Sequence, residues 1–356
     1  MPRTRAVAIY ILLCCMLPGV SAIAQDIPVP LERFSKPPRP DAAAQAKEDA
    51  LKRAVAVNPE SAEAWTDLGW RLYKDGRYGE CEYAMSQARI YAPADPYTLW
   101  LSGLAGYAMG NYDAAYKFLW QMWKDNHSYP ETVDMGITYD LLGRIALEKR
   151  DLFTAAYFFG KAGDEQPKNW QVQFLLGITE WYRQRYGESL AAFERARSLR
   201  PGDPLVLDHY AWARAAVDVR YPEDQQFKES KSAIDAALKV DPANGQTYEL
   251  LGRLEFARGN TSAAVDALKR SISLAPDSTG SRYFLAKVLI SIGTPDARIE
   301  AKQLLLDAIA LAPAYWEGNE ESPHAHLLAQ MFADEGSYER AQQLLDWIAT
   351  QDEEAR

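Results

Sequence analysis

Residue types that carry catalytic or metal chemistry are sparse in this 356-residue sequence. Cys81 is the one cysteine beyond residue 24, and no histidine or basic cluster lies near it in the sequence, so we expect a packed thiol. His324 and His326 stand beside Glu320 and Glu321, but residues two apart point to different helix faces, which favours a solvated helix start over a metal site. No zinc-protease, nucleophile-elbow, P-loop or paired CxxC motif occurs, so we expect no enzyme and no cofactor.

Two pairs of opposite charge occur at a spacing of four residues, Asp140 with Arg144 and Glu249 with Arg253. Residues four apart lie on one face of a helix, where such pairs form ion pairs within that helix. Their presence therefore points to helices as the elements that position these side chains.

Small residues recur from residue 42 onward in two series, the second about twelve residues after the first. Two antiparallel helices approach closely only where side chains are small, so each repeat is predicted to be a helix pair with one small residue on each helix. Prolines at 93, 167, 201, 242, 276 and 313 end the second helices. The first series is Gly69, Gly103, Gly143, Gly177, Ala211, Gly252, Ala286 and Ala329, and the second is Cys81, Ala115, Ala155, Ser189, Ser230, Ala264, Ala301 and Ala341.

The first full repeat carries Trp65, Leu68, Gly69, Leu72, Tyr78, Cys81, Met85, Ala88 and Pro93. In this order and spacing the chain resembles the tetratricopeptide repeat (TPR) family over residues 42–350. The resemblance implies an all-α fold, a right-handed superhelical α-solenoid of about eight helix-turn-helix repeats.

Several segments depart from the regular repeats. Residues 42–57 are predicted to form an N-terminal capping helix, residues 338–349 the last helix, and residues 351–356 a polar tail. Extra residues at 124–134, 217–226, 293–297 and 314–321 are predicted to form surface loops, because helix-pair stacks tolerate length changes between helices.

In similar repeat proteins the first helices line a concave groove, and here the stripe beside the packed face is rich in aromatic residues. Large aromatic side chains in a concave site are typical binding anchors. The alternative is that these rings pack against neighbouring repeats. The predicted partner-binding residues are Trp70, Tyr73, Tyr97, Trp100, Leu104, Tyr107, Phe174, Ile178, Trp181 and Trp212.

The N-terminus is typical of an exported protein. Arg3 and Arg5 precede an apolar run at residues 6–17 and the pattern Ala22-Ile23-Ala24, which predicts a signal peptide at residues 1–24, cleaved before Gln25. Twelve apolar residues span about 18 Å as a helix, too short for a hydrocarbon core of about 30 Å, so no membrane span is expected in the mature chain. Residues 25–41 are rich in proline and are predicted to form an extended tether. We expect a periplasmic or secreted protein.

A formal net charge of -10 leaves no general surface for neutralising phosphates, which argues against a nucleic-acid partner. Two function classes remain. The first is a scaffold or adaptor that binds a peptide or helix of a partner protein, within a cell-envelope or secretion assembly; the apolar members Leu104 and Ile178 favour it. The second is glycan handling in polysaccharide assembly or export, where aromatic faces would contact sugar rings.

Overall fold

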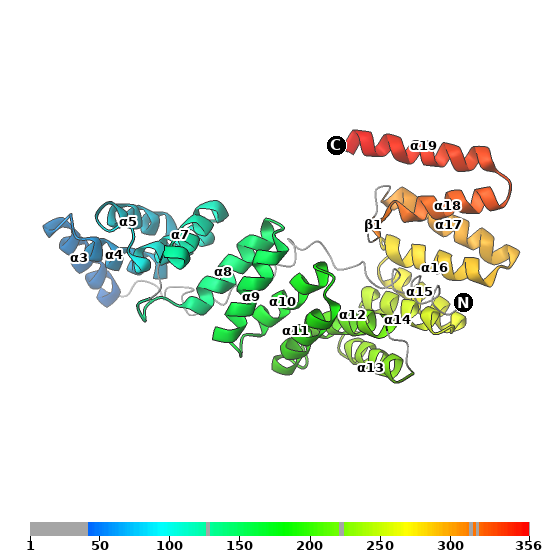
Figure 1. Cartoon of the computed structure of the whole chain (residues 1–356), viewed down its shortest axis with the longest axis horizontal. Coiled ribbons are helices and arrows are strands. Elements are labelled where there is room, and N and C mark those ends of the chain that lie inside the picture. Colours follow the sequence, from blue (N-terminus) through cyan, green and yellow to red (C-terminus); the bar gives the residue numbers. More distant parts are fainter. Residues whose placement is uncertain (1–41, 126–128, 221–223, 313–315, 318–319, 356) are drawn as a thin grey trace. The chain divides into compact units, whose positions relative to one another are not determined.

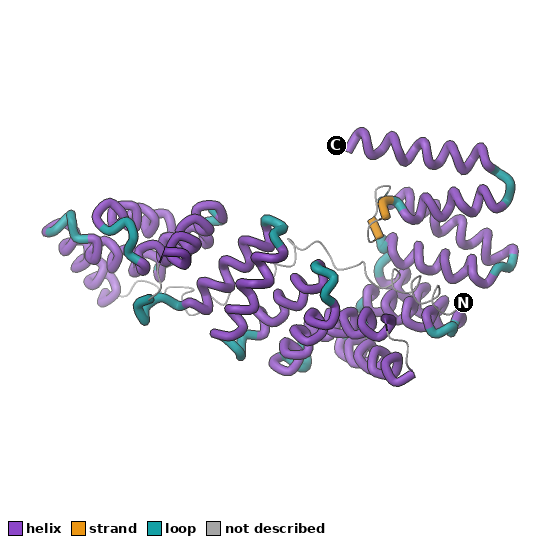
Figure 2. The backbone as a smooth tube through the Cα atoms, viewed as in Figure 1, coloured by secondary structure: helices purple, strands orange, loops and turns teal. Residues whose placement is uncertain are grey.

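The protein is α-helical, in a computed structural model that describes residues 42–125, 129–220, 224–312, 316–317 and 320–355. These residues form seventeen helices and one two-stranded hairpin (Figures 1 and 2). The signal peptide predicted at residues 1–24 and the tether predicted at 25–41 lie outside the described residues. The chain divides into two compact units that meet in sequence between Arg185 and Tyr186.

The N-terminal unit is a capping helix followed by helix pairs, as predicted. Side-chain oxygens of Ser61, Asp95 and Asp134 cap the first helices of three successive pairs, each accepting a hydrogen bond from a backbone N–H three residues later. Its helices are α3 (Ala42–Val57), α4 (Ala62–Lys74), α5 (Tyr78–Tyr91), α6 (Pro96–Ala108), α7 (Tyr112–Asp125), α8 (Met135–Glu148), α9 (Leu152–Glu165) and α10 (Trp170–Tyr182).

The C-terminal unit continues the alternation of first and second helices. Its helices are α11 (Tyr186–Leu199), α12 (Pro204–Arg220), α13 (Asp224–Val240), α14 (Gly245–Ala257), α15 (Thr261–Leu274), α16 (Thr279–Ile292), α17 (Pro295–Leu311), α18 (Pro323–Asp334) and α19 (Tyr338–Ala355), and its hairpin strands are β1 (Trp316–Glu317) and β2 (Glu320–Glu321). In chain order the seventeen described helices are one cap followed by alternating first and second helices, which confirms the predicted all-α repeat fold.

Four helix pairs close where a glycine on the first helix faces a large residue on the second. A Cβ atom added at Gly103 would lie 2.4 Å from Leu119 Cγ, and one at Gly143 would lie 2.8 Å from the Phe159 ring. Such distances are far below van der Waals contact, so the helices approach as closely as glycine permits. The large residue follows the small one by sixteen positions in Gly69/Met85, Gly103/Leu119, Gly143/Phe159 and Gly252/Leu268.

Parts of two predicted loops are helical instead. Residues 217–220 belong to α12, residues 224–226 to the first turn of α13 and residues 295–297 to the first turn of α17, and each of these helices has 17 residues where α4 has 13. Thr294 caps α17 and Pro295 occupies its first turn, a favourable helix start that the loop prediction overlooked.

The end of the array also differs from the prediction. Helix α19 extends through Ala355 rather than ending at Ala349, so residues 351–355 are not a separate tail; no glycine or proline interrupts this stretch. The segment 314–321 contains the β1/β2 hairpin, in which Trp316 pairs with Glu321.

Within the predicted loop at 124–134, Tyr129 donates a hydrogen bond to the Trp123 carbonyl oxygen at 2.9 Å.

Cys81 is fully buried at the small position of α5, and burial raises the pKa of its thiol to about 12. Cys81→Ala should therefore be nearly neutral, because alanine fills this position in other repeats. Cys81→Leu should destabilise the fold by about 1 to 3 kcal/mol through overpacking. Urea unfolding of both variants measures this difference, and equal midpoints would contradict the packing described for α5.

Candidate functional site: an aromatic surface on α4 and α6

Four aromatic rings from two consecutive first helices form one cluster. Trp70 stacks on Tyr73 within α4, with ring centroids 5.9 Å apart and planes at 3°. Across to α6, Trp70 lies 6.2 Å from Tyr97 and 6.0 Å from Trp100. Tyr97 stacks on Trp100 at 5.8 Å, so the cluster is continuous over two adjacent repeats. Helical spacing places Trp70 beside Tyr73 and Tyr97 beside Trp100, and the packing of α4 against α6 brings the two pairs together.

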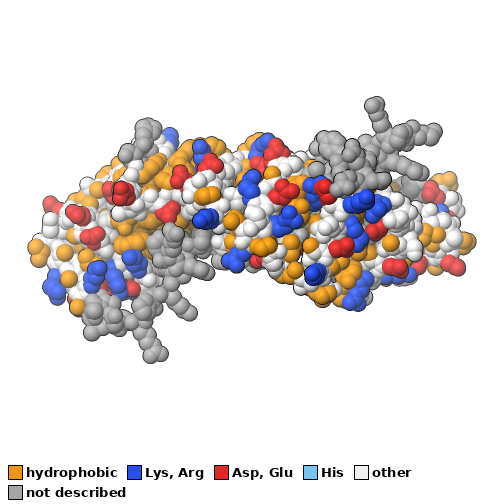
Figure 3. All heavy atoms as spheres, turned by 90° about the horizontal axis from the view of Figure 1, so that it is seen from below, with side chains coloured by type: hydrophobic (Ala, Val, Ile, Leu, Met, Phe, Trp, Pro, Cys, Tyr) orange, Lys and Arg blue, Asp and Glu red, His pale blue; other side chains and the backbone are white. Residues whose placement is uncertain are grey.

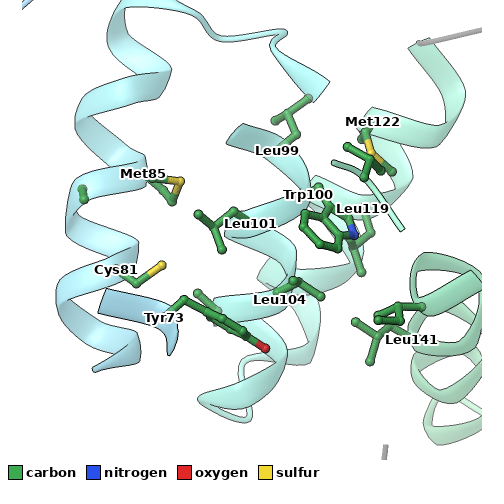
Figure 4. Packing of buried hydrophobic residues seen from close by; sticks show 14 of the residues in the cluster. Tyr73, Cys81, Met85, Leu99, Trp100, Leu101, Leu104, Leu119, Met122 and Leu141 are labelled. Carbon is green, nitrogen blue, oxygen red and sulfur yellow. The ribbon is translucent and has the colours of Figure 1, made fainter. Parts of the chain in front are cut away.

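Burial divides the predicted site residues of this unit. Tyr73, Trp100 and Leu104 are 1% exposed or less, whereas Trp70, Tyr97 and Tyr107 are half-buried and keep part of their surface in solvent. Figure 4 shows Tyr73, Trp100 and Leu104 among the buried side chains of the core. The expectation of solvent-facing anchors is therefore corrected for these three residues. We refer to the half-buried Trp70, Tyr97 and Tyr107 as the aromatic surface.

The remaining predicted site residues are buried as well. Phe174, Ile178 and Trp181 on α10 and Trp212 on α12 are 3% exposed or less. For Trp212 the physical reason is packing against the next first helix, since the Arg253 guanidinium of α14 lies over the rings of Trp212 on α12 and Phe284 on α16. The alternative of packing between repeats therefore holds for Trp212.

Charged side chains border the aromatic surface. Lys74 Nζ lies 4.8 Å above the Trp70 ring, a cation–π distance. Burial, and then the Asp67 carboxylate, raise the pKa of the Tyr97 hydroxyl to about 12. Burial likewise raises the pKa of Tyr107 to about 12. Both phenols are therefore neutral hydrogen-bonding groups at physiological pH, on an apolar surface with charges at its edge.

Comparison with known proteins agrees with this geometry. A family model described as tetratricopeptide repeat matches residues 39–80, 141–204 and 210–279. The chain is built of tetratricopeptide repeats. A solved structure of the C-terminal part of a TPR repeat-containing protein from Cytophaga hutchinsonii superposes with a TM-score of 0.50 at 16% identity, covering 70% of this chain and 96% of that one, which supports the fold alone.

Curated relatives match the TPR array over shorter lengths. The cytochrome c-type biogenesis protein CycH of Pseudomonas aeruginosa is 30% identical over 122 residues, 34% of this chain and 29% of the relative. The CTR9 homolog of Arabidopsis thaliana is 24% identical over 204 residues, 56% of this chain and 17% of the relative. The O-mannosyl-transferase TMTC1 of Mus musculus is 25% identical over 124 residues, 35% of this chain and 13% of the relative. The chain thus spans less than a third of each.

The TPR array also carries exposed aromatic residues outside the predicted groove. Tyr83 on α5, and Phe153 and Tyr157 on α9, are half exposed or more. Sequence reasoning missed them because it considered only first helices; aromatic residues at surface positions of second helices were the available signal. On the face drawn in Figure 3, hydrophobic side chains lie scattered among charged ones.

The described TPR residues hold no group of three or more histidine, cysteine, aspartate or glutamate side chains placed to bind a metal. His324 is buried on α18 rather than solvated as predicted, and burial lowers its pKa to about 4, while His326 is exposed. In the same part of the chain, no helix is both long enough and apolar enough to cross a bilayer.

Proposed function

We propose that this TPR protein is an exported scaffold that binds a peptide or helix of a partner protein at the aromatic surface, within a cell-envelope assembly. The observation that carries the proposal is the four-ring cluster across α4 and α6, which leaves Trp70 and Tyr97 partly exposed between charged side chains. Partly exposed tryptophan and tyrosine, held rigid by buried neighbours, are typical hot spots of protein interfaces.

The sequence argument for a protein partner over a glycan relied on Leu104 and Ile178 as apolar members of the groove. Both side chains are buried, so they favour neither kind of partner. TPR proteins bind protein partners, and the repeat class supports the scaffold. No residue of the described structure favours a sugar specifically.

Removal of the aromatic surface should abolish partner capture without unfolding the chain. Trp70→Ala and Tyr97→Ala are each expected to weaken binding by about tenfold or more, since anchors of this kind typically contribute about 2 kcal/mol. Pull-down from intact cells, followed by mass spectrometry, identifies the partner, and titration then measures the loss.

Tyr83→Ala is the matched control, because it removes an exposed ring of the same kind from α5. It should bind normally. Trp100→Ala is unsuitable as a binding variant, since loss of a buried tryptophan costs about 3 to 5 kcal/mol of stability. Normal binding by a folded Trp70→Ala, Tyr97→Ala double variant, or capture of polysaccharide alone, would contradict the proposal.

Export is proposed from the sequence of residues 1–24. The mature protein should begin at Gln25, because the short apolar run is followed by small residues that suit signal-peptidase cleavage. N-terminal mass analysis of protein released from native cells by osmotic shock tests this prediction. Detection of Met1, or of a lipid on Cys14, would contradict it.

A further inference from the structure

The exposed face of α9 carries a row of five side chains that is basic at one end and acidic at the other. Successive members are separated by three, four, four and three residues, so they lie on one face of the helix and of the turn before it. All five are exposed, and the two rings are 75% and 50% exposed. In chain order the row is Arg150, Phe153, Tyr157, Lys161 and Asp164.

The row is symmetric about Tyr157. Phe153 and Lys161 lie four residues from it on opposite sides. Arg150 and Asp164 lie seven residues from it, about 10 Å along the axis at 1.5 Å per residue. A second α9, turned by 180° about an axis through Tyr157, therefore brings an acidic end to each basic end and an ammonium group to each phenylalanine ring.

The charges of the row are not used within the chain. None of its three charged members forms an ion pair with any residue that the structure describes. The neighbouring Lys149 does form one, since its Nζ lies 2.6 Å from Asp113 Oδ1. A surface of a single charge, such as an anionic lipid layer, would match only one end of the row. A second copy of the row matches both ends.

Neighbouring side chains hold the two rings of the row in place. Tyr157 meets the ring of Phe158, which is 1% exposed, edge-on at 5.2 Å, and that of Trp123 at 6.2 Å. The Arg183 guanidinium lies 4.6 Å from the centre of the Phe153 ring. Aromatic residues are enriched at protein interfaces, and rings that are already fixed lose little freedom on binding.

Gly160 lies beside the row, three residues beyond Tyr157. Glycine inside a helix destabilises it relative to alanine. Packing within the described chain does not require this glycine, because a Cβ atom added there would have no neighbour within 4 Å. Gly143, by contrast, is needed where α8 meets α9. A glycine on an exposed helix face permits close approach by a second backbone.

We propose that two copies of this chain associate through α9, antiparallel to each other and related by a two-fold axis at Tyr157. In this dimer each Phe153 ring meets Lys161 of the other copy, and each Arg150 meets Asp164 of the other copy. The α9 surface shares no residue with the aromatic surface on α4 and α6. The dimer therefore goes beyond the proposed function and does not depend on it.

Sedimentation velocity of the purified protein tests for the dimer. One helix from each copy forms a small interface, so association should be reversible, with a dimer fraction that rises between about 1 and 100 µM protein. Tyr157→Ala should raise the dissociation constant by about tenfold or more, because each copy loses its central ring. Tyr338→Ala is the matched control, since it removes a ring that is 71% exposed on α19, and should leave the dissociation constant unchanged.

Gly160→Gln distinguishes association from folding. Glutamine favours a helix more than glycine does, and its side chain has open space in the single chain. The melting temperature, measured at a concentration where the protein is monomeric, should therefore not fall. The dissociation constant should rise by about tenfold or more, because the added side chain keeps the two helices apart.

Reversal of charge tests which ends meet. Asp164→Lys places like charges together at both ends of the interface and should weaken association by about tenfold. Arg150→Glu combined with Asp164→Lys should restore the dissociation constant to within about threefold of the parent, because opposite charges meet again. Asp266→Lys makes the same charge change at an exposed position of α15 and should have no effect.

Engineered cysteines test the position of the axis. A disulfide requires Cβ atoms about 4 Å apart, which a two-fold axis at Tyr157 permits for Tyr157→Cys and its copy. Phe153→Cys is exposed too, but lies about 12 Å along the helix from its copy. With copper phenanthroline as oxidant, Tyr157→Cys should form the linked dimer about tenfold faster than Phe153→Cys. Cys81 is buried and does not compete.

A parent that stays monomeric up to about 100 µM, or a dimer that Tyr157→Ala leaves intact, overturns the α9 dimer. Equal cross-linking rates for Tyr157→Cys and Phe153→Cys, or a charge reversal that the double variant does not rescue, overturn it as well. All of these results leave the proposed function standing, because association is measured without a partner. Failure of partner capture at the aromatic surface would likewise leave the dimer standing.

Discussion

Arg253→Ala is expected to lower the free energy of unfolding by about 3 to 5 kcal/mol, one of the largest effects of any single substitution in this chain. Arg253 Nη2 donates to Glu249 Oε1 at 2.5 Å, and both side chains are 3% exposed or less. The guanidinium also lies 3.4 Å from the Phe284 ring centroid. Truncation leaves the Glu249 carboxylate buried, with Ser278 and Ser281 as its remaining hydrogen-bond donors.

An exposed ion pair in the same unit is the control. Lys269 and Glu300 are 2.9 Å apart and about half exposed, so Lys269→Ala should cost less than about 1 kcal/mol. The double variant Glu249→Gln, Arg253→Met removes both buried charges and should recover most of the lost stability. Urea unfolding of the three variants compares them. Equal losses for Arg253→Ala and Lys269→Ala would mean that the buried pair is hydrated.

Asp208→Asn should stabilise the protein at neutral pH by about 1 to 3 kcal/mol. Burial raises the pKa of Asp208 from 3.8 to about 6, against the opposing hydrogen bond from Thr247. A carboxyl with a raised pKa binds its proton more tightly in the folded state. The stability it contributes is therefore present below pH 3.8 and is lost as the pH rises through 6, at a total cost of about 3 kcal/mol.

The gain from Asp208→Asn should accordingly be full at pH 8 and vanish near pH 4. Asp266→Asn, at an exposed position on α15, should have no such pH-dependent gain. The neighbouring His209 has the opposite dependence: burial lowers its pKa to about 4, so its contribution is present above pH 6.5 and is lost on acidification. Unfolding midpoints of the parent, Asp208→Asn and Asp266→Asn, measured at pH 4, 6 and 8, test these pH dependences. A gain from Asp208→Asn that is independent of pH would contradict the raised pKa.

The repeat architecture could be predicted from sequence because its determinants are local. Small residues where helices cross, and prolines two positions beyond the second helices, fix the helix pairs before any long-range contact is known. Helix α3 was found by the same means, at its observed bounds of Ala42–Val57. The loop predictions failed at residues 217–220, 224–226 and 295–297 because extra residues can lengthen a helix as readily as the turn beside it.

The candidate site was less predictable, because helical periodicity gives the direction of a side chain but not what covers it. Trp70 and Trp100 were both placed on the groove stripe, yet Trp100 is buried and Trp70 is half-buried. The difference depends on the distance between successive first helices, which the sequence does not encode in any one repeat. Asp140 and Arg144 illustrate the same limit, since their ion pair was predicted but its burial was not.

In the four helix pairs that close on a glycine, the shared separation of sixteen residues between the small and large partners has a kinetic consequence. Every contact of this kind, such as Gly143 with Phe159, closes a loop of the same modest length, so the entropy lost on closure is small and equal from pair to pair. Chains dominated by such short-range contacts fold quickly. Each helix pair can close as soon as its own repeat of about 34 residues is available, before the rest of the chain has been synthesised.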